Sequence, residues 1–264
     1  ASTACAVFAP AGCATVRPYM KPTKQFYKDY INVDPAIDLK NPGIDDPSVR
    51  KLAELFAPVD ERLEFLLRSL SAQDLPPSPD WCQGLMDAFP WLSGMAVLTD
   101  SGTVTYKLPA YTLKPVDYAP LLELEKLYKA RKMGAVVASS ELGAEIMIAK
   151  PLFADNEYKG LLVAHFDPGN LAKFSPEPGK LLIVAPGAPL WNGDDAGAAQ
   201  SLAQLKWKDI FKSNVSGEQR IGGALYLWQS RYVAQTRIVY AVAAVPPAAK
   251  APKQEAPKPE PQKA

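Results

Sequence analysis

Residues 94–108 read GMAVLTDSGTVTYKL, two largely apolar runs joined by Asp100-Ser101-Gly102. A three-residue connection of this kind suits a type I turn followed by glycine in the left-handed conformation, so the sequence predicts a β-hairpin. In the first run both alternating sets of residues are largely apolar, which is typical of a strand covered on both faces. We expect residues 95–99 to form the central strand of an antiparallel sheet.

The strongest helical pattern in the chain precedes this hairpin, at residues 45–73. Its apolar residues recur at intervals of three and four, which predicts one buried stripe. Asp45 or Asp46 suits the N-cap and Pro47 suits the first turn. Pro58 predicts a kink, or two abutting helices, at the middle of the segment. A short helix around Trp81 follows, with Cys82 expected to be a buried apolar residue.

The elements that follow the hairpin do not alternate between strand and helix. The patterns predict, in order, an amphipathic helix at 115–133, strands at 134–142, 144–154 and 158–168, a strand pair around 186–187, a helix at 201–212 and a long hairpin at 222–245. The last strand is expected to be half exposed. This order favours an α+β fold with antiparallel sheets rather than a parallel sheet.

Composition excludes several classes of protein. The 264 residues are 48% hydrophobic, with 29 basic against 28 acidic residues, so the chain can bury the core of one or two domains and lacks the basic surface of a nucleic-acid-binding protein. No run approaches the roughly 18 apolar residues that a membrane-spanning helix needs. One histidine and three scattered cysteines do not supply a tetrahedral zinc site. We therefore expect neither a metal nor a cofactor.

The first 20 residues are rich in alanine and resemble the end of a bacterial export signal. Ala11-Gly12-Cys13 resembles the junction of a lipoprotein, in which the cysteine takes the lipid, although Pro10 departs from that pattern. Cys5 is the competing lipidation site, and a disulfide between Cys5 and Cys13 is the third alternative. We expect an extracytoplasmic protein, either periplasmic or at the outer surface of a bacterial membrane; in the lipoprotein alternative, lipid on Cys13 is its anchor.

The two remaining terminal segments are expected to lie outside the globular part. Residues 21–43 form an extended leader interrupted by prolines, and residues 246–264 repeat Pro, Lys, Glu and Ala with nothing apolar to bury. The second composition predicts a disordered, polyproline II-like tail. Such a tail can serve as a tether or a partner-binding arm, or be a solvated end without a role of its own.

The long helix, the Trp-containing short helix and the strand ending in Asp100-Ser101-Gly102 together resemble the Cache family of extracytoplasmic sensor domains. The run IMIAKPLFADNEYKGLLVAHFDPGNLAKF, residues 146–174, resembles the family's strand through Pro, its turn, and its Gly-led strand closing in Asp. The resemblance covers residues 44–175 and implies a PAS-like fold. Residues 176–245 resemble a reduced second module of the same kind.

The resemblance implies a non-enzymatic domain that binds a small molecule on the sheet face opposite the long helix. The Arg, Trp, Tyr and Asp cluster with which some members clamp amino acids is absent. Transfer of the pocket by position gives these candidate ligand-binding residues: Tyr106, Lys107, Tyr111, Tyr118, Arg131, Ser139, Ser140 and His165. Lys107 or Arg131 would suit a carboxylate ligand. The signal would pass to a separate protein partner; the alternative is a structural or interaction lipoprotein whose pocket is filled by its own side chains.

An enzymatic function would have to use His165, the chain's single histidine. Hydrolases of the Ser-His-Asp type hold the nucleophile on a sharp turn, and the sequence has no G-x-S-x-G. His165 lies mid-strand, on the same side as Leu161 and Val163. The position favours a structural or pocket-lining role over catalysis.

Overall fold

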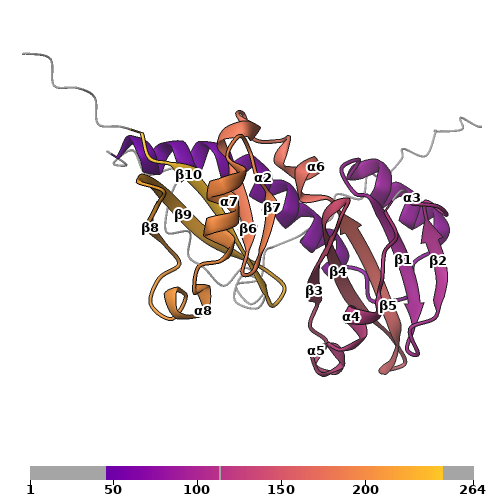
Figure 1. The fold of residues 1–264 in the computed structure, drawn as a ribbon. Helices are drawn as coiled ribbons and strands as arrows, with labels where there is room; N and C mark the ends of the chain where they lie inside the picture. Colours follow the sequence, from indigo (N-terminus) through magenta and orange to yellow (C-terminus); the bar gives the residue numbers. More distant parts are fainter. Residues whose placement is uncertain (1–45, 113, 246–264) are drawn as a thin grey trace, which may run out of the picture.

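The computed structural model describes residues 46–112 and 114–245. Two five-stranded antiparallel sheets lie side by side, and the helix α2 runs along both of them (Figure 1). The first sheet has the order β2-β1-β5-β4-β3 and the second has β7-β6-β10-β9-β8, so the same topology occurs twice. The predicted α+β, PAS-like fold class is confirmed. The predictions for Cys5, Cys13, the leader and the Pro-rich tail lie outside the described residues.

Helix α2 spans Pro47–Ser71 as a single helix of 25 residues. It begins where predicted: the Asp46 carboxylate accepts from the backbone N–H of Ser48 at 2.7 Å, and Pro47 occupies the first turn. Pro58 lies inside the continuous helix, so the alternative of two abutting helices was wrong. The apolar stripe of α2 packs on residues of both sheets and joins them into one core.

The first sheet follows the short helix α3, Pro79–Ala88, in which Cys82 is buried. Its strands are β1 Gly94–Thr99, β2 Val104–Leu108, β3 Gly134–Ser140, β4 Gly143–Ala154 and β5 Glu157–Phe166. The hairpin prediction is confirmed, with Gly102 at φ +86° in the turn. The prediction of a central β1 was wrong, because β5 lies between β1 and β4 and β1 lies between β2 and β5. Seven consecutive residues of β5, from Gly160 to Phe166, are buried.

The segment that crosses from β2 to β3 contains two short helices, α4 Ala119–Leu122 and α5 Glu125–Lys129, instead of the single helix predicted at 115–133. The break falls at Leu124, whose backbone leaves the helical region at ψ 18°. The two helices cover the face of the first sheet opposite α2. Tyr118, Leu121 and Tyr128 pack there against β1, β4 and β5.

The second sheet follows α6, Pro168–Ala172, and a 3-10 turn at Pro178–Lys180. Its strands are β6 Leu182–Ala185, β7 Ala188–Trp191, β8 Ser216–Ile221, β9 Ala224–Val233 and β10 Thr236–Ala243. The sequence patterns missed β8, which is mostly exposed at the edge of the sheet. The last strand is buried for most of its length rather than half exposed, because β10 lies between β6 and β9. Ala234 (φ +52°) and Gln235 form the turn before it.

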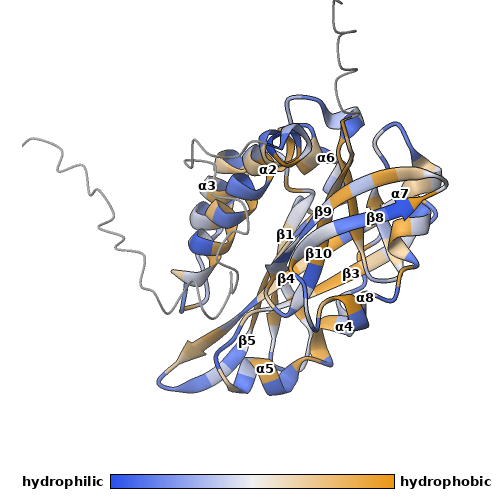
Figure 2. Ribbon diagram, turned by 90° about the vertical axis from the view of Figure 1, so that its left-hand side faces the viewer, coloured by the Kyte–Doolittle hydropathy of each residue, from blue (hydrophilic) through white to orange (hydrophobic). Residues whose placement is uncertain are grey.

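Helices α7, Ala196–Ala203, and α8, Trp207–Ile210, cover the face of the second sheet opposite α2 and replace the single helix predicted at 201–212. The Trp207 indole N–H donates to the carbonyl of Leu202 at 2.7 Å, which satisfies a group at the end of α7. Trp207, Phe211 and Trp228 pack ring against ring on this face. Apolar residues run along the strands of both sheets (Figure 2).

A buried ion pair ties the second sheet to α2. The Arg231 guanidinium on β9 meets the Asp60 carboxylate at two points, Nε to Oδ1 at 3.2 Å and Nη2 to Oδ2 at 2.6 Å. The side chains are only 10% and 14% exposed. Tyr240 lies in the same core and stacks on Phe56 of α2 at a centroid distance of 5.4 Å. This two-point geometry fixes how α2 lies on the second sheet.

The two sheets also meet where the β9–β10 turn reaches the edge strand β3. The Gln235 side chain accepts from the Ala135 N–H at 2.9 Å and donates to the Ala135 carbonyl at 2.7 Å, as a neighbouring strand would. The Thr236 hydroxyl donates to the same carbonyl at 2.7 Å. The contact covers one position of an otherwise open sheet edge.

Replacing Gln235 with alanine is expected to lower the free energy of unfolding by about 1–3 kcal/mol, because the N–H of buried Ala135 loses its hydrogen-bond partner. Urea unfolding of the full chain measures the change. Gln200, exposed on α7, provides the matched control, and Gln200→Ala is expected to change stability by no more than about 0.5 kcal/mol. Equal stabilities for the two variants would contradict a structural role for the Gln235 contact.

Candidate functional site

A cavity of about 350 Å³ lies at one end of the first sheet, on the face opposite α2. Its floor is formed by Glu145 on β4 and His165 on β5, and Ser93 stands just before β1. One wall is the segment after β2, which contributes Pro109, Tyr111, Thr112, Lys114 and Val116. Asp167 and Asn170 of the α6 region form the other side. The volume lies within the range of small-molecule sites.

His165 and Glu145 form a buried pair at the floor of the cavity. His165 is fully buried and its Nδ1 lies 2.7 Å from Glu145 Oε1. The two residues share a face because β4 and β5 pair in a register that aligns Met147 with His165. Nδ1 is thus taken up by Glu145, and Nε2 is the ring nitrogen left for another partner. Nε2 has no hydrogen-bond partner among the described residues.

Lys114 joins the two carboxylates of the cavity. Its ammonium donates to Asp167 Oδ2 and to the Ala144 carbonyl, and lies 3.7 Å from Glu145 Oε2. Asp167 is fixed by its own position as the N-cap of α6, where it accepts from the Gly169 N–H at 2.7 Å. The Asp167 N–H donates in turn to the Ser93 hydroxyl at 3.1 Å. The lining therefore carries one cation and two carboxylates.

Tyr118 adds a hydroxyl next to this pair. Its ring lies 6.3 Å from the His165 ring, centroid to centroid, in an edge-on arrangement. Burial raises the pKa of Tyr118 to about 12, and the charge of Glu145 contributes to the rise, so the phenol stays protonated at neutral pH. The Tyr118 hydroxyl, like His165 Nε2, has no partner within the described part of the chain. Among the described residues, buried polar groups without a partner also occur away from the cavity, at Tyr128, Trp228 and Tyr240, so it is the position of His165 at a cavity that suits its Nε2 to a ligand.

Some of the residues predicted from the sequence lie together at this cavity. Tyr111 and His165 line it, Tyr118 packs beside His165, and the Lys107 ammonium reaches the hydroxyl of the lining residue Thr112 at 3.4 Å. Ser139 and Ser140 are exposed at the end of β3, and the Ser140 hydroxyl is taken up by the β3–β4 turn.

Tyr106 and Arg131 lie elsewhere. Tyr106 packs with the core on the α2 side of the sheet, because it alternates on β2 with Lys107. Arg131 stacks over the Phe153 ring at 4.0 Å and donates to Asn156 at 3.1 Å, by the β4–β5 turn. Its cation is therefore not available to the cavity.

Sequence reasoning missed Lys114, Glu145 and Asn170 as site residues. Asp167 was noted only as the end of the Gly-led strand. Glu145 carried the one usable signal: it stands at the same alternation as Met147 and Ala149, where an acidic residue in an otherwise apolar strand is out of place. Lys114 lies in a segment without periodicity, so no pattern could assign its direction.

Two searches gave no match: no protein-family model matches the sequence, and no curated protein matches it. Solved structures with a similar arrangement were found. One is an extracellular ligand-binding receptor from Desulfohalobium retbaense, at 13% identity and a TM-score of 0.48, covering 74% of this chain and 38% of that one. The described chain thus spans well under half of that receptor.

Two further similar structures are ligand-binding domains of chemoreceptors. The domain of the Pseudomonas aeruginosa amino-acid chemoreceptor PctC, in complex with GABA, is 14% identical at a TM-score of 0.47, covering 74% of this chain and 95% of that one. The domain of Pseudomonas fluorescens CtaA, in complex with L-isoleucine, is 11% identical at 0.46, covering 72% and 88%. These likenesses concern the fold, and the ligands of those proteins are not transferred to this chain.

Proposed function

We propose that this protein is an extracytoplasmic binding protein of the sensor type, which recognises a small solute in the cavity of the first sheet and passes the signal to a separate protein partner. The observation that carries the proposal is His165 at the cavity floor: its buried Nε2 has no hydrogen-bond partner among the described residues, and neither has the hydroxyl of Tyr118, whose ring packs edge-on against the His165 ring. Attachment to the outer face of a bacterial membrane through lipid on Cys13 is part of the proposal.

The charge of the lining favours a ligand with a protonated amine. Two carboxylates, Glu145 and Asp167, line the cavity against one cation, Lys114, so the lining holds more charged acceptors than charged donors. A carboxylate ligand is the alternative. It would have to draw Lys114 away from the two carboxylates that already bind it. Lys107 and Arg131 do not line the cavity.

A non-enzymatic role fits the surroundings of His165. Activation of a nucleophile requires a hydroxyl or thiol hydrogen-bonded to the histidine. Among the described residues no such group bonds Nε2. Within the described ranges, no helix is both long and apolar enough to cross a bilayer.

The test is thermal unfolding of the full chain against a panel of amines, amino acids, carboxylates, purines and sugars. A ligand at a hundredfold excess over its Kd adds about 2.7 kcal/mol to the free energy of unfolding. Glu145→Gln, which keeps the shape and removes the charge, is expected to remove about 1.5–3 kcal/mol of the binding free energy of an amine. The matched control Glu141→Gln, at an exposed position on the β3–β4 turn, should bind as the parent does.

The second candidate is a structural or interaction protein without a ligand. It is favoured by the second sheet, whose face opposite α2 is filled by Trp207, Phe211 and Trp228. If no compound of the panel shifts the unfolding temperature, the sensor proposal fails and this candidate stands. A carboxylate that binds while every amine fails would retain the sensor and overturn the assigned ligand class.

A further inference from the structure

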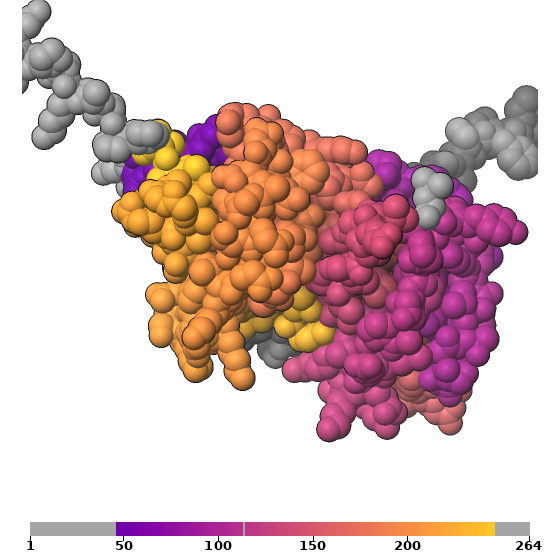
Figure 3. Space-filling view, in the orientation of Figure 1, coloured from indigo at the N-terminus to yellow at the C-terminus, as the bar shows by residue number. Residues whose placement is uncertain are grey.

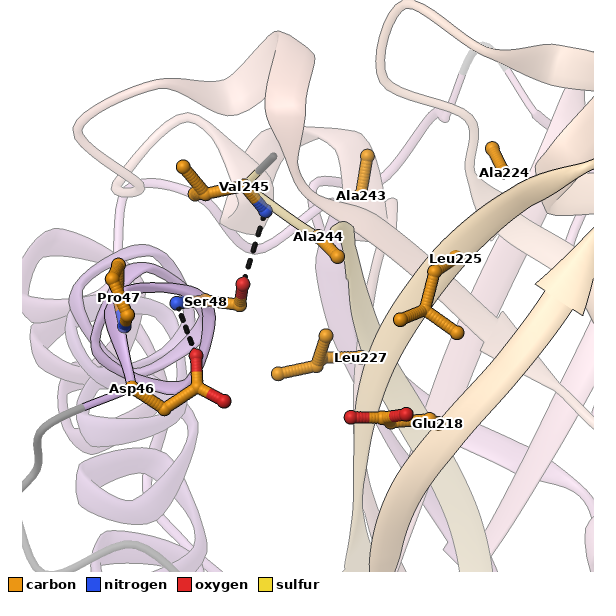
Figure 4. A pocket seen from close by; sticks show the side chains of 10 residues that line it. All are labelled: Asp46, Pro47, Ser48, Glu218, Ala224, Leu225, Leu227, Ala243, Ala244 and Val245. Atoms are coloured by element: carbon orange, nitrogen blue, oxygen red, sulfur yellow. Dashed lines mark hydrogen bonds between the residues drawn. The ribbon is translucent and has the colours of Figure 1, made fainter. Parts of the chain in front are cut away.

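A second, larger cavity of about 730 Å³ opens at the other end of the molecule, between the start of α2 and the second sheet. Pro47 and Ser48 of α2 form one side, with Val245 next to Ser48, and the opposite side is formed by Glu218, Ala224, Leu225, Leu227, Ala243 and Ala244 (Figure 4). We call it the end groove. In Figure 3 the indigo start of α2 lies beside the yellow end of β10 at this end of the molecule.

The end groove is apolar and leads straight into the core. Leu227, 5% exposed, belongs to the cluster that α2 covers, and Ala244 packs against the same cluster. Val245 is 43% exposed at the rim, where its N–H donates to the Ser48 hydroxyl at 3.0 Å. The Asp46 carboxylate already accepts hydrogen bonds from the Ser48 and Val49 N–H groups, so these N–H groups at the start of α2 are not left to bind an anionic ligand. The walls therefore suit aliphatic side chains.

We propose that the end groove is the docking site of residues 37–44, IDLKNPGI, of the chain's own leader. Asp46 is one of the residues that line the groove, so residues 37–44 are connected to the groove wall through Ile44 and Asp45. Seven residues separate position 39 from position 46 and span at most about 25 Å, which keeps the segment within reach at an effective concentration on the order of millimolar.

The composition of the segment matches the groove. Ile37 and Leu39 alternate and so share one side of an extended chain, and Pro42 favours such a backbone. Lys40 is next in the chain, and Glu218 supplies an acidic group on the β8 wall. The segment that leaves the groove at Val245 is a poor competitor, because residues 246–264 hold nothing apolar except alanine and proline.

Docking of residues 37–44 gives the leader a defined path. Any group attached to the chain before residue 37 would then be held next to both the second sheet and the start of α2. Since α2 runs along both sheets, this places the N-terminal attachment at the far end of the same helix that packs on the sheet with the ligand cavity. The inference does not depend on a ligand being bound there.

The decisive experiment compares two cysteine pairs in the full chain with Cys5 and Cys13 changed to serine. Leu39→Cys or Asp38→Cys is combined with Ala244→Cys, and the rate of intramolecular disulfide formation is measured. Docking turns residue 39 toward the groove and residue 38 away, so we expect the first pair to close about tenfold faster or more. Equal rates, as a free tether would give, overturn the proposal, and so do disulfide-linked dimers, which would indicate a second copy as the occupant.

Urea unfolding of two single variants tests the docking of residues 37–44 without relying on disulfide formation. Ile37→Asp is expected to lower the urea midpoint of the full chain, because the charge is excluded from an apolar groove. Asn41→Asp, which adds the same charge at a position with no apolar side chain to dock, is expected to leave the midpoint unchanged. An unchanged midpoint in both variants overturns docking.

Discussion

Replacing Arg231 with methionine is expected to lower the free energy of unfolding by about 3–5 kcal/mol. The substitution keeps much of the side-chain volume but leaves the Asp60 carboxylate inside the core without its cation. The other polar group nearby is the Tyr240 hydroxyl, whose pKa burial and the charge of Asp60 both raise. Urea unfolding of the parent and the variant measures the loss.

Two controls separate the buried charge from lost packing. Asp60→Leu combined with Arg231→Met removes both charges and is expected to recover most of the stability. Lys129→Met breaks the exposed pair with Glu125 and should cost no more than about 0.5 kcal/mol. A double variant as unstable as Arg231→Met would show that packing, and not an unpaired carboxylate, causes the loss.

The same variant should respond to pH. Burial raises the pKa of Asp60, and the charge and hydrogen bonds of Arg231 oppose that rise, so removing Arg231 raises the pKa further. A carboxyl with a raised pKa in the folded state stabilises the fold below its unfolded-state pKa, about 3.9, and this contribution is lost as the pH rises through the folded-state pKa. The deficit of Arg231→Met is therefore expected to be smaller at about pH 4 than at about pH 8. An equal deficit at both would contradict a buried carboxylate.

The elements with strong local patterns could be predicted from the sequence. The cap at Asp46, the buried stripe of α2 and the hairpin at Gly102 each depend on residues close together in the chain. The errors in the number of helices after the first hairpin fell on the segments 115–133 and 201–212. Helical spacing is continuous there, and the breaks at Leu124 and before Trp207 depend on packing against the sheet.

The candidate site could be predicted only in part, for a physical reason. The family resemblance implied a pocket on the sheet face opposite α2, and the cavity lined by Tyr111 and His165 lies on that face. The cation was misplaced, because Lys107, Lys114 and Arg131 look alike in sequence and only the fold directs one of them between Glu145 and Asp167. Edge strand β8 was missed since an exposed strand lacks apolar alternation.

Gly160 is the glycine of the Gly-led strand that forms part of the sequence resemblance. The structure gives a physical reason why this position must be glycine. Gly160 pairs with Thr99 of β1 at φ +135°, and a Cβ built there would lie 1.9 Å from the Leu98 carbonyl oxygen. Both the backbone conformation and the space therefore require glycine. Since the obstacle is backbone, a larger residue could enter only by moving β1 away from β5.

Gly160→Ala is accordingly expected to lower the free energy of unfolding by about 3–5 kcal/mol, the sum of backbone strain and overpacking. Gly187→Ala is the matched control: Gly187 also has a positive φ, +88°, but nothing lies within 4 Å of its Cβ position, so only the conformational cost of about 1–2 kcal/mol applies. Urea unfolding of both variants measures the difference. If Gly160→Ala cost no more than Gly187→Ala, β1 and β5 could not approach each other as closely as described; a Gly160→Ala chain that does not fold while Gly187→Ala folds would agree with that approach.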